Sequence, residues 1–127
     1  MKKADLSKVA TEELLNLYIR LSMQQGEAAY GAETSRVNRL GDAIYKISNE
    51  IKRRSDDRGE SLRGLFKHSN TRVRFNAAAS LLGVFTKEAR QVMREIADSE
   101  FEMLAFDAKM YLHTLDEWIR EKEQSQI

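Results

Sequence analysis

The sequence predicts an all-α protein folded as a short right-handed α-α superhelix of about three helix pairs. Apolar residues recur at spacings of three and four along most of the chain. Proline is absent and only six glycines occur in 127 residues, too few turn signals for a β-hairpin protein. Apolar positions in the second half also repeat at one fixed offset. We therefore expect one helical domain over residues 1–127, with frayed ends at 1–10 and 121–127.

The first third of the chain predicts a pair of long helices. The first helix begins at Thr11, expected to be its N-cap, and runs to about Gln24 or past it to a break at Gly31. Thr34 or Ser35 caps a second helix with a regular apolar stripe. The stripe consists of Val37, Leu40, Ile44, Ile47 and Ile51. The polar run at 52–59 is expected to be an exposed loop.

Residues 61–85 predict a helix-turn-helix hairpin. A short apolar helix ends at His68, and Ser69 or Asn70 is expected to cap a longer helix from Thr71 to Phe85. The buried side of that helix is predicted to carry Val73, Ala77, Leu81 and Val84. Its polar strip is narrow and consists of Arg72, Asn76, Ser80 and Gly83. A helix with so little polar surface is expected between neighbours on both sides.

A third helix pair is predicted after residue 85. Thr86 is expected to cap a helix whose inner positions are Ala89, Val92, Met93 and Ile96. Ser99 and Glu102 have the spacing of a capping box for the last helix. Its inner positions are Leu104, Ala108, Leu112, Leu115 and Ile119. The polar arc of this last helix is wide, which predicts an end helix facing water.

The second and third pairs repeat at an offset of 31 residues. The matched positions are Val73 with Leu104, Ala77 with Ala108, Leu81 with Leu112, Val84 with Leu115, Leu62 with Met93 and Leu65 with Ile96. One such repeat cannot bury its apolar side alone, so the copies are expected to stack. The first pair fits less well, at a shift of 33, and we interpret it as a divergent capping pair.

The hairpin resembles a HEAT-type repeat, in which Val-Arg and then an Ala-rich stretch follow the turn. Val73-Arg74 and Ala77-Ala78 match that pattern. Arg74 lies within the apolar arc of its helix, where an unpaired charge is costly, so we expect a carboxylate partner, Asp107 or Asp98. The resemblance implies that this arginine ties neighbouring repeats together.

From about Thr11 to Arg120 the chain is similar to a family of small bacterial α-helical proteins of unassigned function with an α-α superhelical fold. The resembling segments are Leu14-Leu15 with Tyr18, Asn38-Arg39-Leu40, Val73 to Ala78, and Ala108 with Met110 and Leu112. The resemblance implies an architecture. It implies no activity, because a fold does not carry a function.

Composition indicates a cytoplasmic protein. Cysteine is absent, which excludes disulfides and thiolate metal sites and suits a reducing compartment. The basic start, Met1-Lys2-Lys3, is not followed by the apolar stretch of a signal peptide. No segment approaches the roughly 20 apolar residues of a membrane-spanning helix, so no membrane partner is expected.

The sequence shows no catalytic or metal-binding pattern. His68 and His113 are far apart and lack the spacing of a zinc site. We expect His68 to complement the carbonyl end of its helix and His113 to lie on the surface. Adjacent carboxylates such as Asp56-Asp57 point in different directions on a helix, so they form no acid/base pair. We predict no enzyme and no cofactor; turnover of nucleic acid is a third, weaker hypothesis.

The favoured hypothesis is a protein-protein interaction module: an adaptor, an inhibitor or an immunity protein for a toxin. In a stacked solenoid the second helices of the pairs line a concave binding face. The residues expected there are Arg39, Asp42, Tyr45, Lys46, Asn49, Arg72, Asn76, Ser80, Asp107, Tyr111, Thr114 and Trp118. Tyr111 and Trp118, seven residues apart, share one side of their helix. They either contact a partner or pack against the chain's own tail or neighbouring helix.

The alternative hypothesis is nucleic-acid binding through a basic middle. Residues 36–74 contain eleven basic and five acidic residues, a net charge of +6, while residues 75–127 carry −4. The candidate contacts are Arg36, Arg39, Lys46, Lys52, Arg53, Arg54, Arg58, Arg63, Lys67 and Arg72. Binding requires these groups on one face. Uneven charge also arises simply because helices of a soluble repeat protein carry mixed charge.

Overall fold

The structure, a computed structural model, describes residues 5–99 and 103–125, and over these ranges every regular element is a helix. The elements are η1 (Leu6–Lys8), α1 (Thr11–Tyr30), α2 (Thr34–Arg53), α3 (Glu60–Arg63), η2 (Gly64–Lys67), α4 (Thr71–Leu81), α5 (Thr86–Ala97) and α6 (Ala105–Ser125), where η marks a 3-10 helix. The prediction of an all-α fold is confirmed. No helix within the described ranges combines the length and apolarity needed to cross a membrane.

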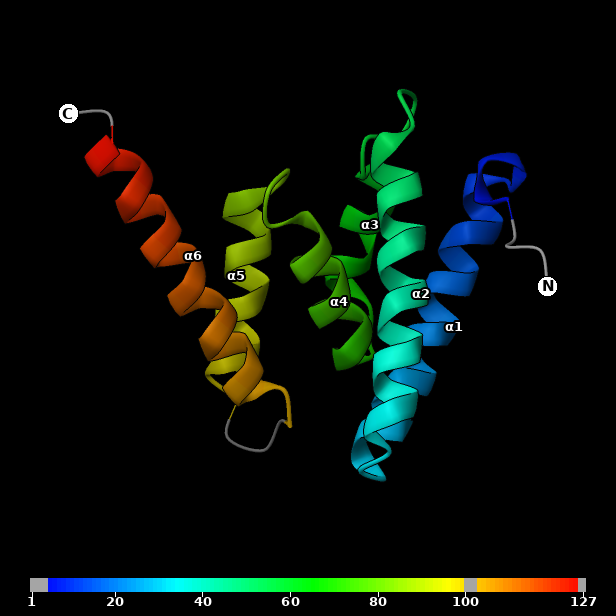
Figure 1. Cartoon of the computed structure of the whole chain (residues 1–127), viewed down its shortest axis with the longest axis horizontal. Coiled ribbons are helices and arrows are strands. Elements are labelled where there is room, and N and C mark those ends of the chain that lie inside the picture. Colours follow the sequence, from blue (N-terminus) through cyan, green and yellow to red (C-terminus); the bar gives the residue numbers. More distant parts are fainter. Residues whose placement is uncertain (1–4, 100–102, 126–127) are drawn as a thin grey trace.

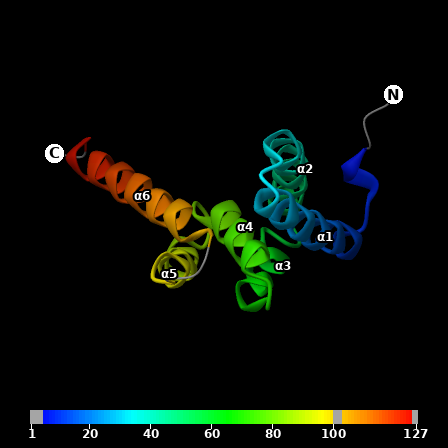
Figure 2. The ribbon, with the colours of Figure 1, turned by 90° about the horizontal axis from the view of Figure 1, so that it is seen from below.

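The helices follow one another in chain order across the molecule, as an α-α superhelix requires (Figure 1). Seen from below, α2, α4 and α6 lie on one side, and α1, α3 and α5 lie on the other (Figure 2). The buried apolar residues of α4 contact both neighbouring pairs and form one continuous core with them. Toward its C-terminus, α6 diverges from α4 (Figure 1).

The first two helices have the expected extents but different caps. α1 continues through Gly26 and ends where Gly31 forms its C-cap. Ala10, not Thr11, is the N-cap of α1, because the Thr11 hydroxyl accepts a hydrogen bond of 2.9 Å from Arg54 Nη1 instead. Glu33 is the N-cap of α2 and makes no side-chain capping bond, so the prediction of Thr34 or Ser35 is also wrong.

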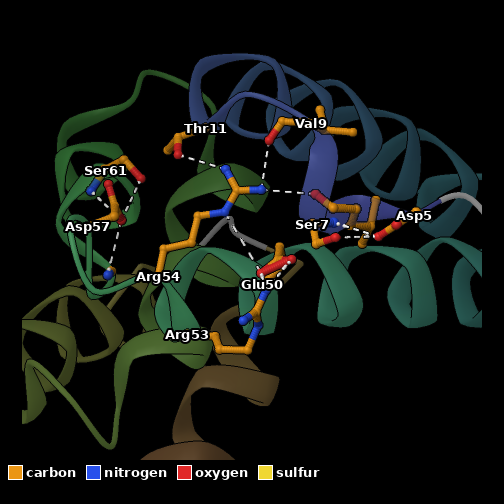
Figure 3. Close-up of polar contacts among 11 residues, drawn as sticks. Asp5, Ser7, Val9, Thr11, Glu50, Arg53, Arg54, Asp57 and Ser61 are labelled. Carbon is orange, nitrogen blue, oxygen red and sulfur yellow. Dashed lines mark hydrogen bonds and ion pairs between the residues drawn. The ribbon is translucent and has the colours of Figure 1, made fainter.

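The polar run at 52–59 is not simply an exposed loop. Lys52 and Arg53 form the end of α2, and Arg54 reaches back to the start of the chain (Figure 3). Arg54 Nη2 donates to the carbonyl oxygens of Leu6 and Val9, at 2.9 and 2.7 Å. From residue 5 onward, the N-terminal segment expected to be frayed is therefore a 3-10 turn tied to α2.

Gly59 closes the loop between α2 and α3 in a left-handed backbone conformation, with φ of +92°. A Cβ atom at this position would lie 2.9 Å from Leu81 Cδ2 of α4. The Asp57 carboxylate fixes the turn by accepting hydrogen bonds from the Gly59 and Ser61 amides and the Ser61 hydroxyl (Figure 3). Glycine is required here by both the backbone angle and the close approach of Leu81.

The central hairpin is present but shorter than predicted. Its first helix divides into α3 and the 3-10 turn η2, and Asn70 caps α4 by accepting a bond of 3.1 Å from the Val73 amide. α4 ends at Leu81, and Val84 in the following turn is 50% exposed, so its predicted inner position is wrong. The Thr86 hydroxyl donates to the Leu82 carbonyl across this turn, which leaves Phe85, not Thr86, as the N-cap of α5.

Arg74 has carbonyl partners where a carboxylate was expected. It donates to the His68 and Ser69 carbonyl oxygens, at 2.7 and 3.3 Å, and to the Thr71 hydroxyl at 3.1 Å. Asp98 and Asp107 are therefore not its partners, because the carbonyls of the preceding turn lie closer to it along the chain. His68 Nδ1 accepts from the Asn70 amide at 3.0 Å, so its ring supports this turn through that hydrogen bond.

The last pair matches most of its predicted pattern. All four inner positions of α5 are buried, as are Leu104 and Ala108, while Leu112, Leu115 and Ile119 are only partly buried. α6 is helical to Ser125, so residues 121–125 are not frayed. His113 lies on the surface as expected, with Nε2 3.1 Å from Glu117. The proposed capping box includes Glu102, which lies outside the described residues.

Candidate functional site

A groove of about 480 Å³ lies between α2, α4 and α6, on the side where the sequence predicts a concave face. Six of the predicted binding residues line it: Tyr45, Arg72, Asn76, Ser80, Asp107 and Tyr111. The other lining residues are Gln25, Gly41, Ile44, Ser48, Lys52, Phe75, Ala79 and Met110. Helices far apart in the sequence therefore meet at one concavity of the size that binding sites usually have.

The other six predicted residues lie outside the groove. On α2, the side of the helix that faces the groove carries Gly41, Tyr45 and Lys52, which turns Arg39, Asp42, Lys46 and Asn49 toward solvent. Thr114 and Trp118 share a side of α6 with Tyr111 but lie one and two turns farther along, where α6 diverges from α4 (Figure 1).

The polar floor of the groove is held by bonds within the chain. Asn76 Nδ2 donates to Ser22 Oγ at 3.0 Å and to Gln25 Oε1 at 2.9 Å. The Ser80 hydroxyl is hydrogen-bonded to the Tyr18 hydroxyl at 2.9 Å. Burial raises the pKa of Tyr18, so this phenol stays neutral and the bond persists at physiological pH. Asn76 and Ser80 thus join α4 to α1 and contribute little free polar surface.

The walls of the groove are aromatic and apolar. Tyr45 on α2 is 66% exposed, and Met110 and Tyr111 on α6 are 48% and 42% exposed. Tyr111 also packs edge-to-face on buried Phe75 of α4, with ring centroids 5.4 Å apart. Tyr111 therefore packs against a neighbouring helix, as one of the two interpretations expected, and still exposes part of its ring. Trp118 is 54% exposed, with the Lys122 amine 5.7 Å from its ring.

Two cationic side chains and one carboxylate line the groove. Lys52 donates one hydrogen bond of 2.9 Å to the Ser80 carbonyl, which leaves two ammonium protons for a ligand. Arg72 lies 5.9 Å above the Phe75 ring, and Asp107 lines the wall formed by α6. Neither histidine lines the groove. Within the described ranges, no cluster of three or more His, Asp or Glu has the arrangement of a metal site.

Sequence patterns left several groove residues undetected. Phe75 and Met110 lie outside the apolar stripes used to find the core, and Lys52 was assigned to a loop. Gly41 gave a usable signal, because a glycine inside a helix commonly marks a close approach. A Cβ there would lie 3.1 Å from Gln25 Nε2, so α1 and α2 pack closely at this point.

Several residues of the basic middle are engaged within the chain. Arg36, Arg53 and Arg63 pair with carboxylates, whereas Lys52 and Arg54 donate to main-chain carbonyls. Within the part of the chain that the structure describes, Arg39, Lys46, Arg58 and Lys67 are exposed and make no ion pair or hydrogen bond. These four lie on α2, in the following loop and on η2.

Comparisons with known proteins cover most of this structure. A family model described as Domain of unknown function (DUF2019) matches residues 12–116, which include every residue that lines the groove. The crystal structure of protein RPA1889 from Rhodopseudomonas palustris CGA009 is similar, with 35% sequence identity and a TM-score of 0.84 over 91% of this chain and 95% of that chain. A search of curated proteins gave no match.

Proposed function

The chain belongs to the family described as a domain of unknown function (DUF2019), and we propose that this member is a non-enzymatic protein-protein interaction module. The groove between α2, α4 and α6 is its binding face, and the module acts as an adaptor or inhibitor in the cytoplasm. The observation that carries this proposal is the pair of exposed aromatic walls, Tyr45 and Tyr111, above a floor that is already hydrogen-bonded.

The side chains that line the groove indicate what kind of peptide segment it would bind. Tyr45, Met110 and Tyr111 offer apolar surface for an aromatic or aliphatic anchor, the kind of contact that dominates protein interfaces. Lys52 retains donors beside that surface and favours a carboxylate near the anchor. We expect a peptide segment with an apolar side chain flanked by Asp or Glu.

Selection from a random-peptide display library against the purified protein tests this proposal. The expected result is enrichment of peptides with an apolar anchor next to an acidic residue. Tyr45→Ala with Met110→Ala should weaken binding of the enriched peptides at least about tenfold, as truncation of a central interface residue typically does. Both side chains are about half exposed or more, so the melting temperature should change little.

Tyr30→Ala is the matched control, because Tyr30 is 83% exposed at the end of α1 and does not line the groove. It should bind the selected peptides as the unchanged protein does. If the Tyr45→Ala, Met110→Ala variant binds the selected peptides as tightly as the unchanged protein does, the binding site lies outside the groove. Failure to enrich any peptide, with a folded protein, would contradict the proposal.

Nucleic-acid binding is the second candidate, supported by the exposed Arg39 and Lys46, which lie seven residues apart on one side of α2. Two such cations predict weak binding that falls steeply with salt. Fluorescence anisotropy with single- and double-stranded DNA and RNA at low and moderate salt separates this candidate from the first. Absence of salt-sensitive binding would eliminate it.

A further inference from the structure

The outer side of α6 is unusually apolar for a helix at the end of a chain. Met103, just before the helix, and Phe106, Met110, Tyr111 and Trp118 within it are all between 42% and 69% exposed. Single exposed apolar residues are ordinary, but several on one helix mark an interaction surface. α6 packs against α5 on its other side and touches α4 through Tyr111, but each of these side chains keeps a large exposed fraction.

The groove-facing side of α6 carries an aromatic pair and a charged pair that are centred on the same point of the helix. Tyr111 and Trp118 are seven residues apart, Asp107 lies four residues before Tyr111, and Lys122 lies four residues after Trp118. At 100° per residue these four residues fall within an arc of about 60°. Their midpoint lies between Thr114 and Leu115 for both the aromatic and the charged pair.

We propose that a second copy of this chain occupies the groove, docked through antiparallel α6 helices related by a two-fold axis. This proposal rests on the binding groove proposed above. In that register, Tyr111 of each copy faces Trp118 of the other, and Asp107 faces Lys122. A two-fold interface requires such self-complementarity, because one surface must serve as both partners.

The charges on this side of α6 favour a second copy as the occupant. Of the four residues on this side, Asp107 lies nearest the N-terminal end of α6 and Lys122 nearest its C-terminal end. Antiparallel pairing of two α6 helices therefore places an aspartate beside a lysine at both ends of the contact. Lys122 is located on this side by its contact with the Trp118 ring. Asp107 makes no ion pair or hydrogen bond with other described residues, which leaves its carboxylate available.

The same register brings the indole of one copy to the groove of the other. Tyr111 forms part of the groove wall and rests on Phe75, so a Trp118 side chain facing it stands at the groove mouth beside Met110. Tyr–Trp pairs across an interface gain both apolar burial and favourable ring geometry. Trp118, which lies outside its own groove, thereby becomes a ligand for the groove of the second copy.

The exposed area limits the strength of this dimer. Met110, Tyr111 and Trp118 each expose roughly half of their surface. Since large side chains bury about 150–250 Å² each, these three offer about 300 Å² of exposed area per copy for burial in the dimer. Stable complexes bury about 800 Å² per partner, so the α6 pairing alone predicts a transient dimer. A segment of another protein that binds the groove would compete with it.

Reversing the charge of Asp107 or of Lys122 tests the proposed register of the two α6 helices. Asp107→Lys alone places two lysines together at both ends, and Lys122→Asp alone places two aspartates together. Each single variant should raise the dimer dissociation constant about tenfold in analytical ultracentrifugation at low salt. An equimolar mixture of the two variants should dimerise as the unchanged protein does, because both contacts then join unlike charges.

Two variants on the far side of α6 control for net charge. Lys109→Asp and Glu123→Lys change the charge by the same amounts as Lys122→Asp and Asp107→Lys, and both residues are exposed. They lie about 180° and 140° around the helix from Trp118, so dimerisation should be unaffected. The chain has a single tryptophan, and its fluorescence should shift to shorter wavelength as the protein concentration rises.

A protein that stays monomeric over the concentration range, or a mixture that fails to restore dimerisation, would overturn the α6 register. A monomeric protein that still enriches peptides dependent on Tyr45 and Met110 would leave the proposed interaction function standing. Dimerisation without any peptide enrichment would support self-docking and contradict a groove for other proteins. The two proposals are therefore tested by separate measurements.

Discussion

The helix pair α1–α2 and the helix pair α5–α6 flank the same central helix, α4, but contact it by different chemistry. Part-buried hydrogen bonds from Asn76 and Ser80 join α4 to α1, in addition to apolar packing. On the other side, α5 presents buried apolar residues to the core and Tyr111 of α6 packs on Phe75 of α4, while the ion pairs there lie outside the contact with α4. Arg63 to Glu88 joins α3 to α5, and Arg90 to Asp116 joins α5 to α6.

The difference shows that an apolar repeat does not fix how deeply each copy is buried. Leu81 and Leu112 occupy matched positions of the 31-residue repeat, yet Leu81 is 0% exposed and Leu112 is only partly buried. α4 has helices on both sides, whereas α6 packs mainly on α5, touches α4 through Tyr111 and diverges from the rest (Figure 1). The last described helix keeps the pattern of a core helix but exposes part of it, and this exposed part is the surface to which we propose that a second copy binds.

The largest expected effect comes from truncating the matched leucines. Leu81→Ala should lower the free energy of unfolding by about 3 kcal/mol, because it removes a buried side chain and leaves a cavity. Leu112→Ala should cost about 1 kcal/mol, since water already reaches the site. Urea denaturation measures both. Equal losses would mean that α6 is packed as firmly as α4.

A smaller effect is expected from the polar contacts of α4. Asn76→Ala leaves the Ser22 hydroxyl and the Gln25 carbonyl group without their donor in the core, which should cost about 1–3 kcal/mol. Thr114→Ala, at an exposed position of α6, should change stability by less than about 0.5 kcal/mol. An unchanged melting temperature of the Asn76→Ala variant would show that water replaces the lost hydrogen bonds without a cost in stability.

The smallest effect concerns the exposed pair between Arg63 and Glu88. The hydrogen bonds from Arg63, with a weaker contribution from its charge, hold the pKa of Glu88 below its usual range. Because the pKa is lower in the folded state, the contribution of Glu88 to stability is present above the unfolded pKa and is lost as the pH falls through the folded value. Salt should weaken the pair as well.

Arg63→Gln should raise the pKa of Glu88 toward its usual value in an NMR titration of the carboxyl carbon. Arg36→Gln is the control, because Arg36 pairs with Glu33 at the start of α2 and not with Glu88. An unchanged Glu88 titration in Arg63→Gln would mean that the pair does not persist in solution.

Local patterns predicted most helices and much of the core, but not their ends. The inner positions of α5 and three of the five stripe positions of α2, namely Ile44, Ile47 and Ile51, are buried as predicted, because periodicity indicates which side of a helix is buried. Val37 and Leu40, nearer the start of α2, are only partly buried. The caps at Thr11 and Thr86 were wrong because other groups took their hydroxyls, the guanidinium of Arg54 in one case and the Leu82 carbonyl in the other. Such competition involves residues that the local pattern does not include.

Half of the predicted binding residues line the groove, and the reason lies in helix rotation. A sequence pattern shows that Tyr45 and Lys46 are on the outside of α2, but not which of them faces α6. That choice depends on how α2 rotates to bury Ile44, Ile47 and Ile51 against its neighbours. Once the rotation is set, Tyr45 enters the groove and Lys46 turns to solvent.

The sequence alone determined the all-α class, the order of the helices and the apolar side of each, because these follow from periodicity and turn chemistry within short segments. Only the tertiary structure decided that Asn76 and Ser80 of α4 hydrogen-bond to α1, that Arg74 supports a turn, and that α6 exposes apolar side chains. The physical reason is that burial and hydrogen bonding are properties of neighbours in space. The residues of a helix determine which of its sides can be buried, and the neighbouring helices determine how much of that side is buried.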